Sequence, residues 1–427
     1  MKSNQVDDNS PSSQRMVGNS NAQSKLMDPS YEGKINWGYT LGYIIVILIG
    51  CFHYGYGLCI FGSSLTLYAK MYGWNAGINT DNWSVISVVT LLLGAFLIGL
   101  VSHHFLYQGR RFGLYCAAAF NILSLLFISV WQWPEGNKTL ALSMLIIGRL
   151  ILGFSIGLYS STCTCFINEI SPEVSRARFG CAIQMTIGIG IAVIYGVGVG
   201  FNMGPDDMEG KELVEYLTYG FLWRFASAIP SFLAVIQCIL LLTYFTLDSP
   251  QYYIEQNNDE KAKESLRRVF SEEGVVENKL AKLKEMREQK DKDATNDLPY
   301  SDYVKGFWVG LTIPALQQLT GINVLTMFAP TAFENQGNAE VLSAVLSVFH
   351  SVFAAISIVI VNKVGKKILL LIGSAVIVIG YIVCLITYSD DGSNQAKNWV
   401  YNVATFLIVG IFNLSWGPMT YIFLLII

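Results

Sequence analysis

Long runs of apolar residues, separated by shorter polar stretches, dominate the chain from residue 39 onwards. A helix needs roughly 20 residues to cross the hydrocarbon core of a membrane, and ten segments have about that length. We therefore predict ten membrane-spanning helices, at residues 39–61, 83–105, 112–132, 139–166, 180–203, 222–246, 306–332, 339–361, 367–388 and 398–427. The pattern predicts an all-α membrane protein.

Two polar segments divide this pattern. Residues 1–38 are rich in Ser, Asn, Gln and Asp, which predicts a disordered cytoplasmic tail. Residues 247–305 carry many Lys, Arg and Glu side chains and separate six spans, residues 39–246, from four, residues 306–427. Apolar residues in the second polar segment recur at helical spacing, namely Leu266, Val269, Phe270, Leu280, Leu283 and Met286. They predict short amphipathic helices, which form either a solvated cytoplasmic linker or a small cap that latches the two halves.

Composition supports the membrane setting and excludes other classes. Hydrophobic residues make up 52% of the chain and charged residues 14%, and the mean hydropathy is +0.44. These values differ clearly from those of a typical soluble domain. A net charge of −3 identifies no partner, and no basic patch with interleaved aromatic residues indicates nucleic acid. All eight cysteines lie inside predicted spans, so we expect them to pack rather than to form disulfides or a zinc site. We expect no cofactor or enzyme chemistry, because no nucleophile with a base and no phosphate-binding loop occurs.

The basic residues predict the orientation of the spans. Lys and Arg residues in short loops stay on the cytoplasmic side of a membrane. With a cytoplasmic amino terminus, the inner segments hold 22 Lys and Arg residues and the outer loops hold four, namely Lys70, Lys138, Lys211 and Lys397. We therefore expect the amino terminus in the cytoplasm, with no cleavable signal peptide before the first span.

One predicted span is unusually polar. Residues 306–332 contain the adjacent Gln317 and Gln318, followed by Asn323. Gly321 lies between Gln318 and Asn323. Amide side chains inside a membrane lose water and must find other hydrogen-bond partners. This cluster indicates a pathway for a polar, uncharged solute, and hence a solute carrier. Glycine at this point also fits a break in the helix.

An internal repeat relates the two halves. Gly109-Arg110-Arg111, between the second and third spans, is matched by Gly365-Lys366-Lys367, between the eighth and ninth. Each basic turn follows the first two spans of its half. Extending this symmetry predicts two further helices after residue 427, so the second bundle would be incomplete.

Several short motifs occur in a fixed order. The first half contains Gly109-Arg110-Arg111, Gly148-Arg149, Glu169-Ile-Ser-Pro172 followed by Arg176, and Trp223-Arg224. The second half contains Gln317-Gln318-Leu-Thr-Gly-Ile-Asn323, Val364-Gly-Lys-Lys367 and Gly417-Pro418. With this order of motifs the chain resembles the sugar porter family of the major facilitator superfamily, across roughly residues 40–427. The amide-rich run and the Trp-Arg segment are most similar to those of hexose transporters of apicomplexan parasites.

The resemblance implies two helical bundles around a central site that opens alternately to either side. It assigns contacts with sugar hydroxyls to Gln184, Gln317, Gln318 and Asn323, and amides suit this work because each both donates and accepts. The site positions at which the family usually carries Asn, Glu and Trp are here His350, Asn413 and Tyr421. A cytoplasmic charged gate is assigned to Arg110, Arg111, Glu169, Arg176 and Lys367. For Gln184, hydrogen bonding between helices is an equal alternative.

The sequence leaves more than one hypothesis open about whether transport is coupled to protons. No Asp or Glu lies in the interior of a predicted span, and Gly57 stands where proton-coupled relatives of the resembled family carry Asp. This favours facilitated diffusion, and we predict transport of hexose across the plasma membrane. His53 and His350 can titrate near neutral pH, which leaves open a proton-coupled symporter of another solute, such as a polyol. A non-transporting sensor, or a degenerate remnant of a transporter, is the third hypothesis.

Overall fold

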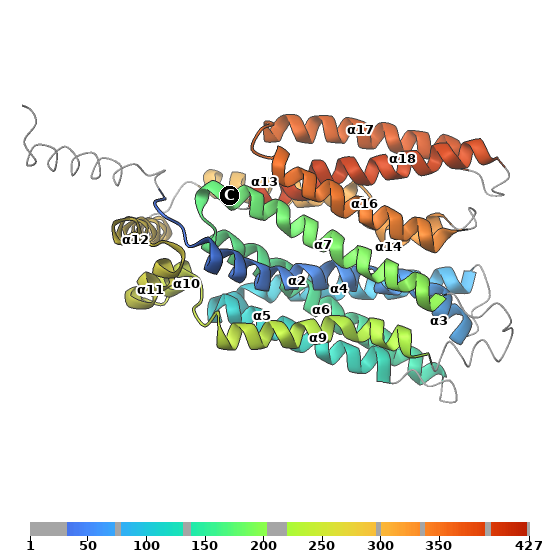
Figure 1. Cartoon of the computed structure of the whole chain (residues 1–427), viewed down its shortest axis with the longest axis horizontal. Coiled ribbons are helices and arrows are strands. Elements are labelled where there is room, and N and C mark those ends of the chain that lie inside the picture. Colours follow the sequence, from blue (N-terminus) through green and yellow to red (C-terminus); the bar gives the residue numbers. More distant parts are fainter. Residues whose placement is uncertain are drawn as a thin grey trace, which may run out of the picture.

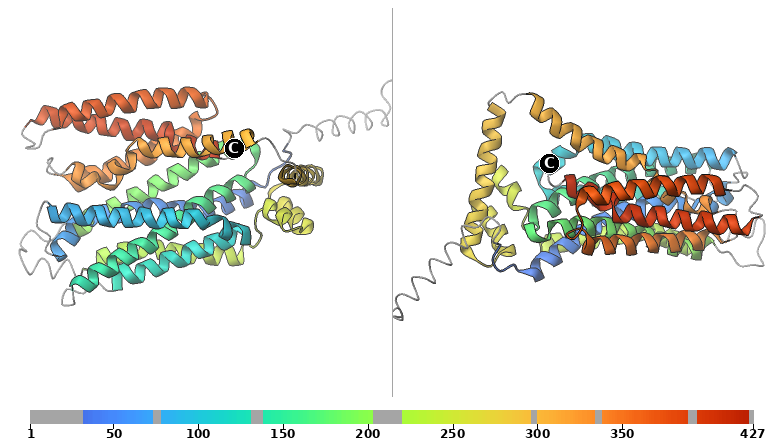
Figure 2. Two further views of the ribbon diagram at one scale, coloured as in Figure 1. Left: turned by 180° about the vertical axis from the view of Figure 1, so that it is seen from behind. Right: turned by 90° about the horizontal axis from the view of Figure 1, so that it is seen from above.

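The computed structural model describes residues 32–72, 78–130, 138–202, 220–295, 300–333, 338–388 and 394–424. The regular structure of these residues is helical, apart from one isolated β-bridge between Ile35 and Phe270. Long helices run side by side along one axis, and the helices of residues 250–295 lie across one end of them (Figures 1 and 2).

The helices before residue 247, which we call the first half, include six long ones. Their bounds are α2 (Trp37–Ser63), α4 (Ile78–Gln108), α5 (Arg110–Leu125), α6 (Lys138–Ile170), α7 (Glu173–Asn202) and α9 (Phe221–Thr243). The short helix α3 (Leu65–Tyr72) follows α2, and the π-helical turn η1 (Leu126–Val130) extends α5. Each of these long helices overlaps most of one of the spans expected from the hydrophobic pattern.

The helices after residue 299, which we call the second half, are more broken. Their bounds are α13 (Tyr300–Leu319), α14 (Ile322–Met327), α15 (Ala329–Ala332), α16 (Ala339–Ile360), α17 (Lys366–Thr387), α18 (Gln395–Leu414) and α19 (Trp416–Leu424). In the described part of the chain, nine helices are long and apolar enough to cross a membrane, counting α18 and α19 together. The all-α membrane class is therefore confirmed.

The remaining predicted span, residues 306–332, is not one continuous helix. It is divided into α13, α14 and α15. Gly321 separates the first two with a φ of 74°, a left-handed conformation that residues with a Cβ rarely adopt. Ser415, just before Gly417, similarly separates α18 from α19. The hydrophobic pattern identified the length of the span, whereas backbone conformation at single residues interrupts it.

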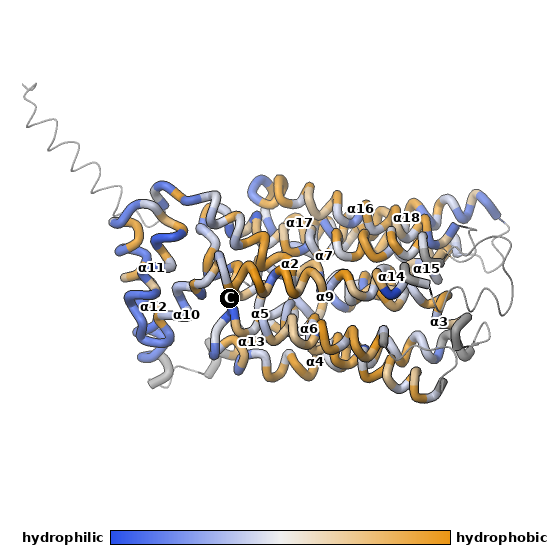
Figure 3. Tube along the Cα trace, turned by 60° about the horizontal axis from the view of Figure 1, so that its bottom comes forward, coloured by the Kyte–Doolittle hydropathy of each residue, from blue (hydrophilic) through white to orange (hydrophobic). Residues whose placement is uncertain are grey.

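Apolar side chains cover the outside of the bundle as well as its interior. Figure 3 shows hydrophobic residues along the bundle of long helices and many hydrophilic ones at the end where residues 250–295 lie. In the apolar 18-residue stretch of each helix, 11% of α17 is buried inside the protein, whereas 72% of α2 is buried. Helix α2 is thus a central helix, while α17 presents apolar residues on faces that touch no protein. Such faces require lipid, so the chain is an integral membrane protein.

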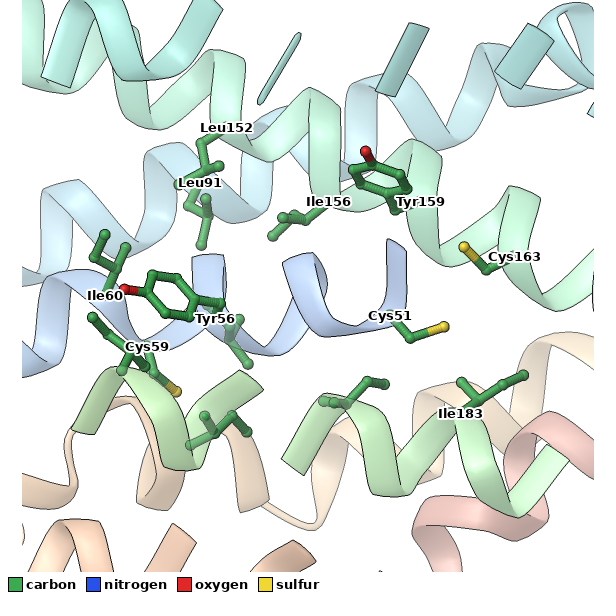
Figure 4. Close-up of a cluster of buried hydrophobic side chains, with 14 of the residues drawn as sticks. Cys51, Tyr56, Cys59, Ile60, Leu91, Leu152, Ile156, Tyr159, Cys163 and Ile183 are labelled. Atoms are coloured by element: carbon green, nitrogen blue, oxygen red, sulfur yellow. The ribbon is translucent and has the colours of Figure 1, made fainter. Parts of the chain in front are cut away.

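Helix α2 packs between α6 and α7 (Figure 4). The approach to α7 is close because Gly55 has no side chain, and a Cβ there would overlap the backbone carbonyl of Ile187. Gly190 faces α2 in the same way, since its Cβ would overlap the carbonyl of Phe52. Small residues at such crossings allow two membrane helices to bring their backbones together.

Replacing Gly55 with leucine is expected to force α2 and α7 apart and lower the melting temperature of the purified protein. Overpacking a close contact costs about 1–3 kcal/mol, and more where the obstacle is backbone. Gly99→Leu is the matched control, because a Cβ at Gly99 would meet nothing within 4 Å. Equal melting temperatures for the two variants in a thermal-shift assay would contradict this account of the contact.

Three helices lie across one end of the bundle (Figure 2). They are α10 (Pro250–Glu255), α11 (Asp259–Val269) and α12 (Glu273–Thr295), and we call them the cap. Its small core contains the predicted apolar residues Leu266, Val269 and Phe270, with Leu280 and Leu283 packed against them. Hydrogen bonds from Arg267 and Lys263 lower the pKa of the Glu273 carboxyl to about 2. The charged pairing between α11 and α12 is therefore intact at neutral pH.

The end of the predicted tail differs from the expected disorder. The Glu32 side chain is nearly inaccessible, and its carboxylate accepts hydrogen bonds from the backbone N–H groups of Glu173, at 2.5 Å, and Val174, at 3.2 Å. Lys279 of the cap pairs with the same carboxylate at 3.2 Å. The first N–H groups of a helix lack partners within it, so a carboxylate is stabilised there. Residues 1–31 lie outside the described part of the chain.

Candidate functional site

A cavity of about 40 Å³ lies between the two halves, where α2 and α7 meet helices of the second half. It is lined by Tyr54, Leu58, Gln184, Ile187, Ile191, Gln317, Gln318, Ile322, Asn323, Thr326, His350, Phe412 and Tyr421. A volume of this size accommodates only a few water molecules. The structure is therefore nearly closed around this point.

Six of the seven predicted substrate-binding residues line this one cavity, namely Gln184, Gln317, Gln318, Asn323, His350 and Tyr421. They come from α7, α13, α14, α16 and α19. The seventh, Asn413, is not a lining residue and lies fully buried behind Gln184. The structure brings these residues together, and their contact with a solute stays a prediction.

Gln184 is the residue that joins the two halves at the cavity. Its Nε2 donates to Oδ1 of Asn413 at 2.9 Å and lies 3.3 Å from Nε2 of His350. Gly417 makes room for it, because a Cβ there would lie 3.0 Å from the Gln184 side chain. The amide thus forms the interhelical hydrogen bond that the sequence left open, while its side chain also lines the cavity.

The break between α13 and α14 arranges the other three amides. Gln317 and Gln318 lie near the end of α13, and Asn323 lies in the first turn of α14. Asn323 Nδ2 donates to Gln318 Oε1 at 2.5 Å, across the turn at Gly321. Gln317 Nε2 lies 3.5 Å from the carbonyl oxygen of Trp416, at the second helix break. Broken membrane helices of this kind are tolerated where they are buried in protein or line a polar cavity.

The structure separates the two histidines. His350 lines the cavity, and its Nδ1 is buried with no hydrogen-bond partner in the part of the chain that the structure describes. His53 lies inside the first half, where its ring nitrogens are 2.5 Å and 2.6 Å from the carbonyl oxygens of Ile49 and Pro230. Its ring stacks on Tyr159. Of the two proton-carrier candidates, only His350 lies at the central cavity.

Sequence reasoning missed the apolar walls of the cavity. Leu58, Ile187, Ile191 and Phe412 supply much of this surface. The two isoleucines follow Gln184 by three and seven positions, so they share its face of α7. That spacing is a signal from which they could have been found. Nothing comparable in the local pattern marks Phe412.

Helix α14 lies toward the end of the bundle away from the cap (Figure 3), where it packs against α2 of the first half. The hydroxyl of Tyr195 on α7 donates to the carbonyl oxygen of Thr326 at 2.6 Å, and the carbonyl oxygen of Met327 is 3.2 Å away. Cys59 Sγ on α2 also lies 3.5 Å from the Thr326 carbonyl. Carbonyls at the end of a short helix lack intrahelical partners, so the tyrosine bonds to groups that the helix break has freed.

Tyr195→Phe is expected to loosen this closure. Losing one hydrogen bond, worth about 0.5–1.5 kcal/mol, shifts a two-state equilibrium roughly two- to tenfold. The readout is labelling of a cysteine introduced at Met327 by a membrane-impermeant thiol reagent, which we expect to become faster by that factor. Tyr56→Phe is the control, because the Tyr56 hydroxyl donates to the Ala226 carbonyl within the first half, at 2.6 Å. Similar labelling rates in both variants would refute a closing role for Tyr195.

Charged residues meet at the opposite end of the bundle, beside the cap. Arg110 pairs with Glu169 at 2.6 Å and with Glu255 of the cap at 3.0 Å. The Arg110 and Glu169 side chains are 6% and 5% exposed, so this is a buried ion pair. The hydroxyl of Ser249 also donates to the Glu169 carboxylate. The cluster ties α5 and α6 to the cap.

The neighbouring Arg111 makes a different set of contacts. Its guanidinium donates to the backbone carbonyl oxygens of Thr246 and Leu241, the latter at 2.6 Å. Its backbone N–H donates to Asp248 Oδ2 at 3.1 Å. Burial raises the pKa of the Asp248 carboxyl, although the N–H groups of Ser249 and Arg111 donate to it. Arg111 therefore holds the end of α9 rather than a carboxylate of the gate.

Of the predicted gate residues, Arg110 and Glu169 alone pair with each other among the residues that the structure describes. Arg176 lies near Glu169 on the wall of a separate cavity of about 150 Å³ under the cap. Lys367 is exposed at the start of α17 in the second half, and no ion pair involves it within the described ranges. The ion pairs at this end thus lie within the first half and the cap, and the five residues do not form one cluster in this conformation.

A polar cavity between two helical halves, flanked by broken helices inside a lipid-facing bundle, defines a membrane carrier. The family model described as "Sugar (and other) transporter" matches residues 43–425. The chain belongs to this family of sugar transporters, and the resemblance drawn from its motifs is confirmed.

Individual relatives agree with the family. The chain is 27% identical over 405 residues to Hexose transporter 1 of Plasmodium knowlesi, covering 90% of this chain and 77% of that protein. It is 30% identical over 291 residues to solute carrier family 2, facilitated glucose transporter member 2 of Bos taurus, covering 65% of this chain and 52% of that protein. A structure of the proton:xylose symporter XylE bound to 6-bromo-6-deoxy-D-glucose matches with a TM-score of 0.76, at 22% identity, over 91% of this chain and 82% of that one. That likeness shows the major facilitator fold.

Proposed function

We propose that this protein carries a hexose sugar across a membrane by alternating access and facilitated diffusion. One observation carries the proposal, namely that a single cavity between the halves gathers the side chains of Gln184, Gln317, Gln318 and Asn323. Membership of a sugar transporter family supports it, as do the names of the relatives.

The chemistry of the cavity suits a sugar. Each amide can donate to one hydroxyl and accept from another. The Nδ1 atom of His350, which has no hydrogen-bond partner among the described residues, adds one more polar group. Leu58 and Ile187 offer apolar surface to the C–H groups of the ring, against which Tyr421 can also pack. At about 0.5–1.5 kcal/mol net for each hydrogen bond, such a site binds weakly. Weak binding is what a carrier needs in order to release its solute.

The present conformation has too little room for a hexose, which supports a cycle of opening and closing. On one side the Tyr195 hydroxyl holds α14 against the first half. On the cap side, Cys181 of α7 packs with Val361 and Met419 of the second half. The two halves must separate at one of these contacts before a sugar can enter. In this cycle the structure represents a state closed at both ends.

We place the cap and the amino terminus in the cytoplasm and the carrier in the plasma membrane. The 22 basic residues of the proposed inner segments, against four in the proposed outer loops, support this orientation. We divide the chain into a tail of residues 1–38, a six-helix bundle of residues 39–246, a linker of residues 247–305 and a four-helix portion of residues 306–427. Glu32, which lies within the proposed tail, contacts the start of α7.

The test is uptake of labelled glucose into proteoliposomes that contain the chain, with no imposed proton gradient. We expect saturable uptake that persists in a proton ionophore. It should fall about tenfold in Gln317→Ala, since one lost transition-state hydrogen bond of about 1.4 kcal/mol corresponds to that factor. The control is Gln256→Ala, an exposed glutamine of the cap. No uptake by correctly inserted protein would contradict hexose transport and favour a sensor, a remnant or another solute.

A proton-coupled symporter is the second candidate, and the position of His350 in the cavity favours it. Histidine is the side chain whose ordinary pKa lies nearest to physiological pH. Uptake that requires an inward proton gradient, and that loses this requirement in His350→Asn, would replace facilitated diffusion with symport.

A further inference from the structure

His350 is a titratable side chain at the junction of the two halves. It lies on α16 of the second half, and its Nε2 is 3.3 Å from Nε2 of Gln184, on α7 of the first half. The ring packs against the α7 backbone, because a Cβ at Gly188 would lie 2.6 Å from His350 Cδ2. His350 therefore belongs to the contact that is lost when the halves move apart.

A backbone carbonyl fixes the direction of the hydrogen bonds that lead to His350. Asn413 Nδ2 donates to the carbonyl oxygen of Val409 at 2.7 Å, and a carbonyl oxygen can only accept. Asn413 therefore turns its Oδ1 toward Gln184, where it accepts from Gln184 Nε2 at 2.9 Å. The Gln184 nitrogen carries two hydrogens, so the second is available to His350 Nε2.

This arrangement specifies the form of the histidine. Nε2 can accept from Gln184 only when it carries no hydrogen, so the ring is neutral and its hydrogen is on Nδ1. Protonation places a hydrogen on Nε2 as well, facing the donor of Gln184. Turning the ring over brings Cε1–H to the same place, which is not an acceptor either.

Gln184 cannot adapt to a protonated ring without a loss elsewhere. Turning its amide would offer Oε1 to His350, but this oxygen would then face Asn413 Oδ1 across a distance that is now 2.9 Å. Turning Asn413 as well would set its Oδ1 against the carbonyl oxygen of Val409. Each arrangement leaves two donors or two acceptors facing each other, which is costly where water is excluded.

No charged side chain beside the ring offsets a proton on His350. The ring lines the central cavity and a second one of about 10 Å³, and the described residues that line these two cavities include no Asp, Glu, Lys or Arg. Their other titratable members are Tyr54 of α2, Tyr195 of α7 and Tyr421 of α19, and a tyrosine is ordinarily neutral below about pH 10. The other helices that line them, α13, α14, α15 and α18, contribute no titratable group.

We propose that His350 is a positioning residue whose protonation controls whether the two halves stay joined at the cavity. The neutral ring accepts from Gln184 and supports its bond to Asn413, which favours the closed state. The protonated ring breaks this chain of hydrogen bonds, so acid shifts the protein toward states that are open at one end. The inference rests on the alternating access proposed above and adds a regulation of the same site.

The test is the labelling rate of a buried cysteine at each end of the bundle, measured in the purified chain by peptide mass spectrometry. Native Cys181 reports on the cap side, where it packs with Val361 and Met419, and Met327→Cys reports on the other end. The reference is His350→Gln, whose Oε1 takes the place of Nε2 as acceptor and does not titrate. Dividing each rate by the rate in the reference at the same pH removes the pH dependence of the thiol itself.

We expect this ratio to rise about tenfold between about pH 7.5 and about pH 5.5 at one reporter or both. The factor follows from linkage, with a closed state that excludes the proton and an open state that holds His350 at the ordinary histidine pKa of about 6.5. A ratio that stays constant at both reporters would overturn the proposal. His350→Asn is a second reference that does not titrate, for use if His350→Gln does not fold.

Asn413→Leu separates the direction of the hydrogen bonds from the burial of a charge. Without Asn413, Gln184 is free to turn its Oε1 toward a protonated ring, so the acid effect should largely disappear when the variant is compared with its own His350→Gln partner. A tenfold rise that persists would overturn the role of Gln184 and assign the effect to burial alone. Because labelling needs no solute, an acid effect without glucose uptake would contradict only hexose transport, whereas uptake without an acid effect would contradict only this proposal.

Discussion

Replacing Gln184 with leucine is expected to lower sugar uptake about 10- to 100-fold while the protein stays folded. The change removes a polar group that lines the cavity and also takes away the donor to Asn413 Oδ1, now 2.9 Å from Gln184 Nε2. The orphaned acceptor lowers stability by about 1–3 kcal/mol. The loss of uptake has a different cause, because one or two lost hydrogen bonds to the solute, at about 0.5–1.5 kcal/mol each, raise the transport barrier, and each 1.36 kcal/mol is tenfold in rate. Initial uptake of labelled glucose by proteoliposomes measures the effect. Gln256→Leu on the exposed cap is the matched control.

A double substitution separates the two roles of this glutamine. When both partners of a buried hydrogen bond become apolar, the loss of stability is much smaller than for one partner alone. Gln184→Leu combined with Asn413→Leu should therefore recover most of the melting temperature that Gln184→Leu loses. Uptake should stay low, because the amide that faces the solute is still absent. Recovery of uptake in the double variant would show that Gln184 acts only between helices.

Arg110→Leu is expected to lower the free energy of unfolding by about 3–5 kcal/mol, because breaking a buried ion pair leaves an unpaired charge behind. Arg110 holds the carboxylates of both Glu169 and Glu255, and the Glu169 side chain is only 5% exposed. Denaturation of the purified protein in mixed micelles measures the loss. The exposed pair of Arg268 and Glu264, 3.8 Å apart, provides the control, since Arg268→Leu should cost at most about 1 kcal/mol.

A rescue experiment tests the stated cause of this loss. Adding Glu169→Gln to Arg110→Leu removes the unpaired buried carboxylate while keeping an acceptor for the Ser249 hydroxyl. We expect the double variant to regain more than half of the lost free energy. No recovery would mean that Arg110 stabilises the protein through packing and its contact with Glu255, and that the charge of Glu169 is not the reason.

Several features of the fold and the site could be predicted from short stretches of sequence, because each depends only on residues close together in the chain. The length of an apolar run sets a membrane helix, since no other arrangement satisfies the backbone in lipid. The interruption at Gly321 was expected because glycine beside three amides fits a break, and its φ of 74° agrees. The cluster of Gln317, Gln318 and Asn323 marked the cavity because polar side chains are costly in a membrane unless they are used.

Other features depend on residues far apart in the chain, and local pattern carries no information about them. The tail was expected to be disordered from its composition, yet Glu32 is held by the start of α7, 141 positions away. The basic turn at Arg110 and Arg111 reads as one motif, whereas the first residue pairs with a carboxylate and the second with carbonyl oxygens. Such differences arise from which helix end happens to face each side chain.

By itself, the sequence determined that the chain is an all-helical membrane protein, where most of its spans lie, and which amides line one polar cavity. These conclusions follow from the free-energy cost of placing polar groups in a membrane, which applies to each segment separately. Only the tertiary structure decided that Gln184 bonds to Asn413 across the halves and that Tyr195 bonds to the end of α14. Each of these depends on how distant helices pack, because a hydrogen bond or an ion pair exists only when two side chains reach the same few ångströms of space.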